Sequence, residues 1–305
     1  MSQNKPNAVQ TTGHVWDGDL QEYNNPLPNW WTIAFYITIV FSIVYWFIFP
    51  AWPVGHGFTT GFDKITYVND KGETKTSHWN TRALLMKEMN EHAEQQKPYY
   101  DKLMAEPYDK IAKDQDLLNF VASAGKTLFG DNCAACHQSG GGGKVGYFPN
   151  LTDDDWLYGG SYDKIQETIT NGRHGYMPPF AEVLNDTQIT DLANYVLSLS
   201  GEPHDAAKAA AGNQLFHSDT AACFYCHGAD AHGRQVIGSA NLTDKIWLWA
   251  NVPAAQSAED KVAAVKKVIE GGLNKGVMPT WGGRLKPEQI KLLTVYVHDT
   301  LGGGK

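Results

Sequence analysis

The chain has 305 residues, of which 42% are hydrophobic and 19% charged, and its formal net charge at pH 7 is −8. This composition excludes a disordered chain and a protein with many membrane spans. The acidic balance argues against a nucleic-acid partner and allows a basic protein partner. The only four cysteines form two C-x-x-C pairs, which indicates chemistry, because a disulfide scaffold carries more cysteines in a shorter chain.

The first predicted element is a membrane-spanning helix over residues 30–50. Residues 30–49 read WWTIAFYITIVFSIVYWFIF, an uncharged run that spans about 30 Å as a helix, the thickness of the hydrocarbon core of a bilayer. Trp30, Trp31, Trp46 and Trp52 lie at its ends, where amphipathic rings prefer the headgroup level. The run is too long for the apolar part of a signal peptide and no small-x-small cleavage site follows it. We therefore expect an uncleaved anchor in a lipid bilayer.

Residues 51–113 are predicted to connect this anchor to the rest of the chain. Residues 65–68 and 73–76 have the composition of two short strands, and residues 69–72 that of the turn between them. Residues 78–112 are charged and have a helical pattern. The sequence does not indicate what this connector packs against.

The rest of the chain is a tandem repeat, with units over residues 114–202 and 203–305. The matching positions are Cys133-Ala134-Ala135-Cys136-His137 with Cys223-Phe224-Tyr225-Cys226-His227, Asn150-Leu151-Thr152-Asp153 with Asn241-Leu242-Thr243-Asp244, Met177-Pro178 with Met278-Pro279, and Tyr195-Val196 with Tyr296-Val297. Each unit has three predicted helices, over 116–129, 162–171 and 187–200 in the first and over 206–216, 258–270 and 286–300 in the second. The expected fold class is all-α.

The two C-x-x-C-H motifs indicate covalent haem. One turn of chain sets two thiols against the two vinyl groups of a porphyrin, and the next residue, a histidine, reaches the iron. Attachment through Cys133 and Cys136, and through Cys223 and Cys226, uses all four cysteines. A zinc site would place its second pair within about 15 to 20 residues of the first, and a thioredoxin-like pair would have a βαβ context. We therefore predict two haem c groups, with His137 and His227 as axial ligands.

A methionine is expected as the second axial ligand of each iron, because a thioether is a soft donor that raises the iron potential. Met177 and Met278 follow their histidines by 40 and 51 residues and occupy the same position in the repeat. His174 is an alternative to Met177 at the first site. The spacing favours ligation within each repeat, and a methionine supplied by the other repeat stays open.

Three further features concern the surroundings of the haems. Arg173 and Arg234 are candidates for pairing with haem propionates. Asn150 and Asn241 begin N-x-T sequences, and because both recur at one repeat position we interpret them as turns beneath the histidines rather than glycosylation sites. Attachment of haem c takes place outside the cytoplasm. Residues 1–29 are therefore predicted to be cytoplasmic and the haem domains periplasmic.

Each repeat resembles a class I cytochrome c. Gly125 and Phe129, and Gly212 and Phe216, match the first helix of that family, and Tyr195 and Tyr296 match the last. In that family a proline carbonyl commonly orients the proximal histidine. Pro149 matches this pattern, whereas the second repeat has Ala240.

The whole chain resembles CcoP/FixP, the dihaem subunit of cbb(3)-type cytochrome c oxidases. The resemblance rests on Val15-Trp16-Asp17-Gly18-Asp19-Leu20 and on Glu22-Tyr23-Asn24-Asn25-Pro26-Leu27-Pro28-Asn29-Trp30-Trp31 ahead of a single span. It implies a single-pass protein of a bacterial inner membrane that accepts electrons from a donor cytochrome c. It also implies a complex with a monohaem cytochrome c subunit and a haem–copper catalytic subunit, together a proton-pumping terminal oxidase. The chain itself would be an electron relay and no enzyme. A free-standing dihaem shuttle and a dihaem peroxidase are the alternatives.

Overall fold

The computed structural model of the chain describes residues 10–302. Residues 1–9 of the predicted cytoplasmic segment therefore lie outside the described residues. The chain divides into two compact units, residues 1–96 and residues 97–305.

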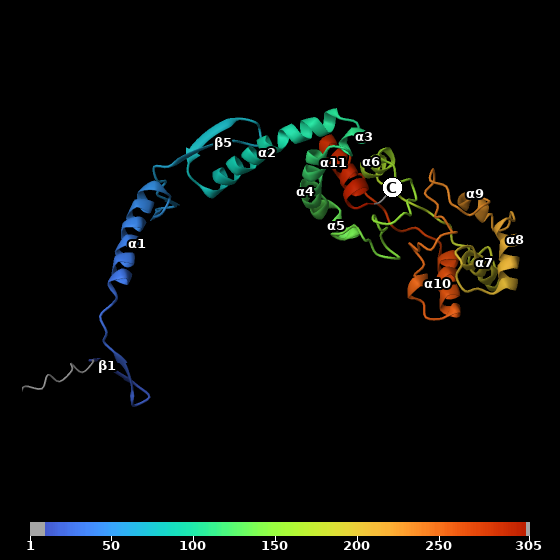
Figure 1. Cartoon of the computed structure of the whole chain (residues 1–305), viewed down its shortest axis with the longest axis horizontal. Coiled ribbons are helices and arrows are strands. Elements are labelled where there is room, and N and C mark those ends of the chain that lie inside the picture. The colour runs from blue at the N-terminus through green and yellow to red at the C-terminus, as the bar shows by residue number, and fades with distance from the viewer. Residues whose placement is uncertain (1–9, 303–305) are drawn as a thin grey trace, which may run out of the picture. The chain divides into compact units, whose positions relative to one another are not determined.

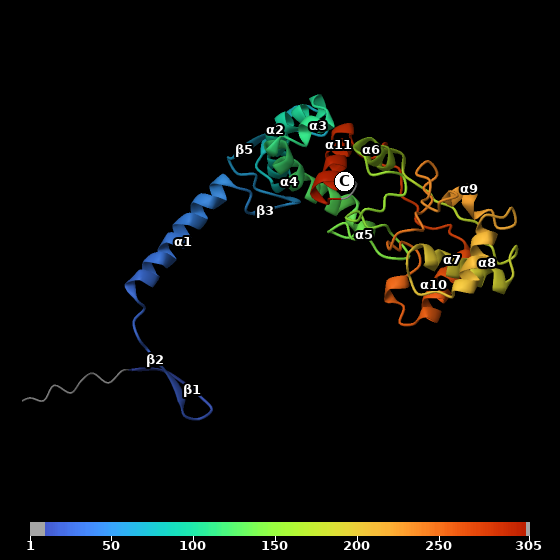
Figure 2. The ribbon, with the colours of Figure 1, turned by 45° about the vertical axis from the view of Figure 1, so that its right-hand side comes forward.

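The first unit contains the predicted anchor. Strands β1 (Thr11–Trp16) and β2 (Leu20–Tyr23) form an antiparallel hairpin, followed by helix α1 (Asn29–Ile48), as Figure 2 shows. Helix α1 is long and apolar enough to cross a membrane and has no buried residue. Its bounds agree with the predicted span to within two residues.

Two more hairpins follow α1 in this unit. Strand β3 (Pro53–Val54) pairs with β4 (Gly57–Phe58), and β5 (Lys64–Val68) pairs with β6 (Thr74–His78). The second of these confirms the predicted hairpin, and the Asn69 side chain closes its turn by accepting hydrogen bonds from the backbone of Lys71 and Glu73. The described chain therefore has three two-stranded sheets beside its helices, so that it is mainly helical rather than all-α.

The end of the predicted connector belongs to the second unit. Helix α2 runs over Thr81–Ala105, and the second unit begins within it, at Lys97; the short helix α3 follows over Tyr108–Ile111. Leu103 and Ile111 are fully buried in the core that also contains helix α4, and the ring of Tyr108 stacks on that of Tyr162 at 4.6 Å. This part of the connector is thus a component of the first haem-motif core.

The second unit contains the predicted repeat helices. Their bounds are α4 (Gln115–Asn132), α5 (Ala134–His137), α6 (Tyr162–Asn171), α7 (Asp186–Leu199), α8 (Ala206–Phe216), α9 (Cys223–His227), η1 (Val252–Ala254), α10 (Ala258–Gly271), α11 (Pro287–Val295) and the π-helical turn η2 (Tyr296–Thr300). Side-chain oxygens cap the N-termini of several of these helices. Asp114 caps α4, and Asn185 forms a capping box with Gln188 at α7.

The helices form two clusters, and each cluster combines both repeats. In the first helical cluster, α11 of the second repeat packs on α4 and α6 of the first. In the second helical cluster, α7 of the first repeat packs on α8 and α10 of the second. Figure 1 shows α4, α6 and α11 together and α7, α8 and α10 together. The repeats have therefore exchanged their third helices, and the predicted domains 114–202 and 203–305 do not close on themselves.

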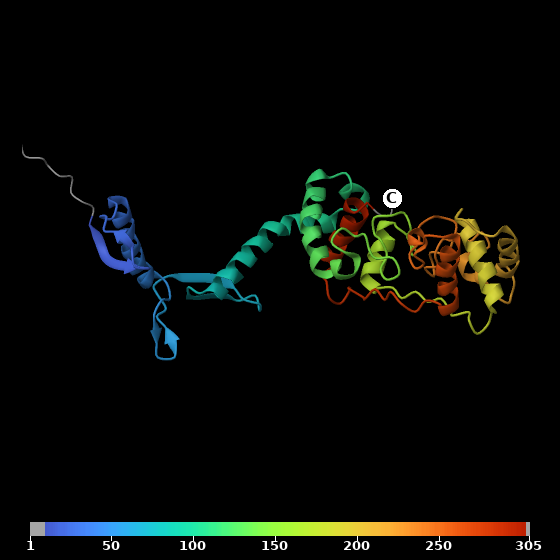
Figure 3. The same ribbon diagram turned by 90° about the horizontal axis from the view of Figure 1, so that it is seen from below.

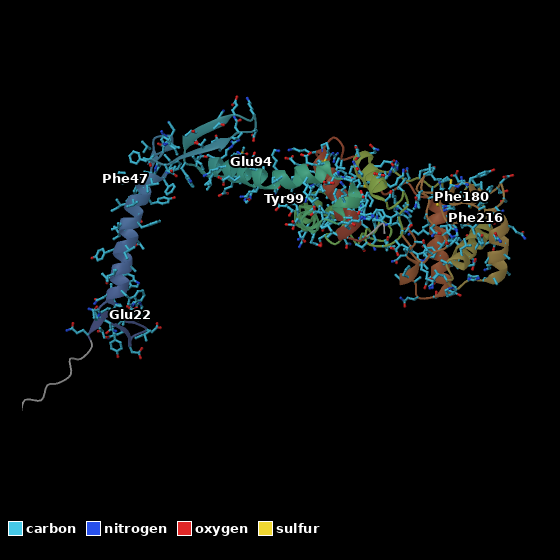
Figure 4. All side chains as sticks on the ribbon, turned by 45° about the horizontal axis from the view of Figure 1, so that its top comes forward. Glu22, Phe47, Glu94, Tyr99, Phe180 and Phe216 are labelled. Carbon is cyan, nitrogen blue, oxygen red and sulfur yellow. The ribbon has the colours of Figure 1, made fainter. Side chains whose placement is uncertain are left out.

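The buried side chains of each cluster come from helices of both repeats. The first cluster has Leu117, Val121 and Phe129 from α4, Ile165 and Ile169 from α6, and Ile290, Leu292, Leu293 and Val295 from α11. The second has Ile189, Leu192 and Leu197 from α7, Phe216 from α8, and Val265 and Ile269 from α10. Figure 4 shows Phe180, which follows the first Met-Pro, close to Phe216 of this second core.

The exchange has a physical reason in the duplication itself. The third helices of two homologous repeats present similar apolar faces, so that either can complete either core, as in domain swapping. Only Ser200–Asp205 separate α7 from α8, and this short connection favours packing of these two helices on each other. The segments that follow α6 and α10 must then cross between the clusters, and Figure 3 shows them running side by side.

Candidate haem sites

The first C-x-x-C-H motif lies where α4 ends. Cys133 terminates α4, and the short helix α5 contains Cys136 and His137. The His137 side chain is buried, and its Nδ1–H donates to the backbone carbonyl of Pro149 at 3.1 Å. Burial lowers the pKa of His137, and this hydrogen bond opposes the effect. The imidazole is therefore neutral and oriented, with Nε2 available for a metal.

The second motif has the same arrangement. Helix α9 contains Cys223, Cys226 and His227, and His227 Nδ1–H donates to the carbonyl of Ala240 at 2.9 Å. Burial lowers the pKa of His227 as well. Because the acceptor is a backbone carbonyl, Ala240 orients the histidine as Pro149 does, and the departure from the proline pattern has no effect on this contact.

The turns beneath both histidines are the predicted ones. Asn150 Oδ1 accepts hydrogen bonds from the backbone N–H of Thr152 at 3.0 Å and from its hydroxyl at 2.8 Å. Asn241 makes the same two bonds with Thr243. Each asparagine is thus part of a local turn that positions the carbonyl next to it.

Each of the two candidate methionine ligands lies beside the C-x-x-C-H motif of the other repeat. Met278 packs in the first cluster with Cys133 and Phe129, whereas Met177 packs in the second cluster with Cys223. This packing differs from the spacing-based expectation that each methionine serves its own repeat. The physical cause is the crossing of the two Met-Pro loops, since each loop leads from a helix of one cluster to a helix of the other.

A ladder of backbone hydrogen bonds fixes this crossing. Met177 and Leu273 exchange two N–H···O bonds of 2.8 Å. Met278 donates to Arg173 at 2.8 Å and accepts from it at 3.0 Å. The two distal loops are therefore joined by two antiparallel bridges, one at each methionine.

His174 does not lie on either site. Its side chain is exposed, and its Nε2 lies 3.0 Å from Asn274 Oδ1 in the opposite loop. It is also absent from the lining of the cavity that contains both motifs. Met177, and not His174, is the candidate ligand in this segment.

One cavity of about 830 Å³ contains both motifs. Its mostly apolar lining includes all four cysteines, both histidines and both methionines. Burial raises the pKa of Cys133 and Cys223 to about 11, so that the folded pocket does not favour thiolates. Within residues 10–302 there is no group of three or more His, Cys, Asp or Glu side chains that could hold a metal ion.

The residues of the cavity fit haem c. Cationic Arg173, Lys275 and Arg284 line the cavity, and carboxylates such as propionates are natural partners for them. Trp247 lines a second, smaller cavity beside the second motif, and its Nε1 is buried without a hydrogen-bond partner among the described residues, so that it is available to an acceptor there. Arg234, the other predicted propionate partner, is exposed and does not line the cavity.

The cavity also contains residues that the sequence interpretation had not singled out. Tyr158 and Trp249 line it from equivalent repeat positions, and Asp155 is the only carboxylate of its lining within the described residues. Aligning the repeats beyond Trp156 and Trp247 would have revealed the aromatic pair. Nothing in the sequence pattern indicates that Asp155 faces the cavity.

Two helical cores built around C-x-x-C-H turns, each with a histidine hydrogen-bonded to a backbone carbonyl, define a c-type cytochrome. Comparison with known proteins agrees. Residues 8–56 match the N-terminal domain of cytochrome oxidase-cbb3, FixP, and residues 121–196 and 207–297 match cytochrome c oxidase, cbb3-type, subunit III. The chain belongs to the FixP/CcoP family of cbb3-type cytochrome c oxidase subunits.

Similar proteins cover nearly the whole chain. The cbb3-type cytochrome c oxidase subunit FixP of Azorhizobium caulinodans is 42% identical, over 97% of this chain and 94% of its own length. FixP of Bradyrhizobium diazoefficiens is 43% identical, over 97% and 95%. The CcoP subunit of Cereibacter sphaeroides is 39% identical, over 99% and 97%.

Proposed function

We propose that this chain is the electron-relay subunit of a cbb3-type cytochrome c oxidase and carries two haem c groups. The observation that supports this best is the pair of equivalent sites in one cavity, each with two thiols, an oriented histidine and a methionine. An electron relay needs two redox centres close together, and a shared cavity provides that proximity.

The proposed ligands are exchanged between the repeats. Cys133 and Cys136 attach the first haem, and His137 and Met278 hold its iron. Cys223 and Cys226 attach the second, and His227 and Met177 hold its iron. When bound, the haem supplies a one-electron couple whose potential a thioether ligand raises.

The surrounding residues favour electron transfer over catalysis. Apolar side chains of both clusters line the cavity, and the carbonyls of Pro149 and Ala240 fix the two imidazoles. With a methionine as well as a histidine as ligands, each iron would have no open position for oxygen or peroxide. The chain is thus no enzyme on its own and passes electrons on to a catalytic subunit.

The proposed setting is a bacterial inner membrane. Helix α1 spans it once, residues 1–29 lie in the cytoplasm, and the haem sites lie in the periplasm, where haem c is attached. The names of the relatives support assembly into a cbb3-type cytochrome c oxidase. The partners that we propose there are a haem–copper catalytic subunit and a monohaem cytochrome c subunit. The electrons come from a donor cytochrome c.

Purification of the tagged chain from membranes in mild detergent tests this function. Haem staining with quantification should give two haems per chain, and a large multi-span haem protein should copurify. A chain that purifies alone would indicate a free-standing shuttle instead. Binding of carbon monoxide by the c-type haems of the chain itself, and not by a copurified catalytic subunit, would indicate an open iron and contradict the proposed ligands.

A further inference from the structure

Two aromatic residues occupy equivalent places between the haem sites. Tyr158 and Trp249 each lie two residues after the tryptophan that recurs in both repeats. Both are half-buried, and both line the cavity that contains the two C-x-x-C-H motifs.

Tyr158 comes from the first repeat and contacts the loops of the second site. A Cβ on Gly238 would lie 2.2 Å from the Cζ atom of Tyr158, so that the ring rests on the bare backbone of the second attachment loop. Its hydroxyl lies 3.7 Å from the Cβ position of Gly175, two residues before Met177. The ring therefore contacts both the attachment loop and the distal loop of the second site.

The orientation of the Tyr158 ring is fixed from its other side. The Arg173 guanidinium lies 4.6 Å from the ring centroid. Glu167 and Thr168 hold that guanidinium at 3.0 and 2.9 Å, and the backbone of Arg173 pairs with Met278 of the first site. Tyr158 thus lies between a residue tied to the first iron's distal loop and the attachment loop of the second.

Trp249 makes the equivalent contact in the opposite direction. It belongs to the second repeat and contacts the loops of the first site. A Cβ on Gly276, two residues before Met278, would lie 2.7 Å from the Cη2 atom of Trp249. The neighbouring carbonyl of Leu248 accepts a hydrogen bond of 2.7 Å from Gly146 in the first attachment loop. Glycine at these positions lets each ring approach the backbone closely.

We propose that Tyr158 and Trp249 form the contact through which electrons pass between the two haem sites; this rests on the function proposed above. One electron leaves one iron and reduces the other, no bond is made or broken, and the rings are not themselves oxidised. Electron tunnelling is faster through closely packed atoms than across a gap, and each ring fills the space between a loop of its own repeat and the loops of the opposite site. Loss of a ring leaves a void that its fixed neighbours cannot close.

The test measures how fast the two haems equilibrate within the oxidase complex. A photoexcited flavin reduces one haem, absorbance follows the redistribution of the electron, and a titration gives both potentials in every variant. Tyr158→Leu and Trp249→Leu should slow equilibration severalfold, and the double variant should be slowest. Tyr158→Phe and Trp249→Phe should keep the parent rate because they keep a ring. Tyr147→Leu, at an exposed tyrosine of the first attachment loop, is the matched control.

The outcomes separate this inference from the function on which it rests. A chain with fewer than two haems would contradict the proposed function. Two haems with unchanged potentials, and leucine variants as fast as Tyr147→Leu, would overturn the role of the rings. Phenylalanine variants as slow as the leucine variants would also overturn it.

Discussion

The ring of Tyr296, from the second repeat, lies directly on the backbone of Gly125, from the first. A Cβ on Gly125 would meet three atoms of the Tyr296 side chain at 2.6 to 2.9 Å. The equivalent contact in the second cluster is between Gly212 of the second repeat and Tyr195 of the first, at 2.8 Å. Both glycines allow a close helix crossing, and at both the helix that approaches comes from the other repeat.

Gly125→Ala should therefore destabilise the first cluster. A methyl group at this position overpacks the helix crossing, which costs about 1–3 kcal/mol of unfolding free energy. Chemical denaturation of the haem-loaded protein, followed at the first haem, measures the change.

Gly130→Ala is the matched control for this substitution. Gly130 lies in the same helix, and a Cβ there meets nothing within 4 Å. It should be neutral or stabilise α4 by about 0.5–1 kcal/mol, because alanine is the better helix former. Equal effects of the two substitutions would mean that Tyr296 does not pack on Gly125.

The exchanged ligands predict which haem each methionine controls. In a chain with Cys223→Ala and Cys226→Ala, only the first haem is attached. Met278→Ala should then make that haem high-spin and able to bind carbon monoxide, and lower its potential, since the thioether is lost. Met177→Ala in the same background should leave its spectrum unchanged.

Ligation within each repeat predicts the opposite result for these two variants. The reciprocal background, with Cys133→Ala and Cys136→Ala, should show the reversed dependence, with Met177 controlling the second haem. Optical spectra of the oxidised and reduced forms decide between the two patterns.

The sequence carried enough information for the elements but not for their assembly. The C-x-x-C-H turns, the six repeat helices and the hairpin of β5 and β6 follow from local spacing and composition. Assembly depends on which copy of a duplicated helix fills which core, and α7 and α11 are too similar for the pattern to decide. For the same reason, the repeat alignment paired Met177 with His137, although it packs beside Cys223.

Two features of the site depend on backbone atoms and on long-range contacts, which a pattern of residue types in the sequence does not describe. The backbone carbonyl of Ala240 replaces that of Pro149 as the partner of a histidine, and any residue supplies a carbonyl. Whether Asp155 faces the cavity depends on how the two N-L-T-D turns approach each other across the repeats. Such long-range contacts are a property of the assembled cores.

Truncation tests the exchange at the level of folding. A chain that ends at residue 202 contains the whole first repeat but lacks α11, which supplies Ile290, Leu292 and Leu293 to the first core. The remaining faces of α4 and α6 would be exposed, so that we expect a haem-bearing but molten first cluster without a methionine-ligated iron. Near-ultraviolet circular dichroism and spin state measure this. A truncated chain with native dichroism and a low-spin haem would show that the first repeat closes on itself.

Asp155 predicts a pH dependence of stability. Burial, with the nearby carboxylates of Asp244 and Asp153, raises its pKa from 3.8 to about 6 in the folded chain. Between pH 4 and pH 6 the folded state therefore binds more protons than the unfolded state, and stability falls as the pH rises through this window. Asp155→Asn removes the ionisable carboxyl and with it this loss of stability. The variant should therefore become more stable than the parent as the pH rises from 4 to 6, and it should keep this advantage above pH 6. We expect the advantage in unfolding free energy to be about 1 kcal/mol, because one pKa unit corresponds to about 1.4 kcal/mol and solvent screens a partly exposed carboxyl.

Thermal unfolding of the haem-loaded protein at pH 4 and pH 7.5 measures the difference, with Asp154→Asn, at an exposed aspartate, as the control. An advantage of the same size at both pH values would show that Asp155 does not titrate in this window.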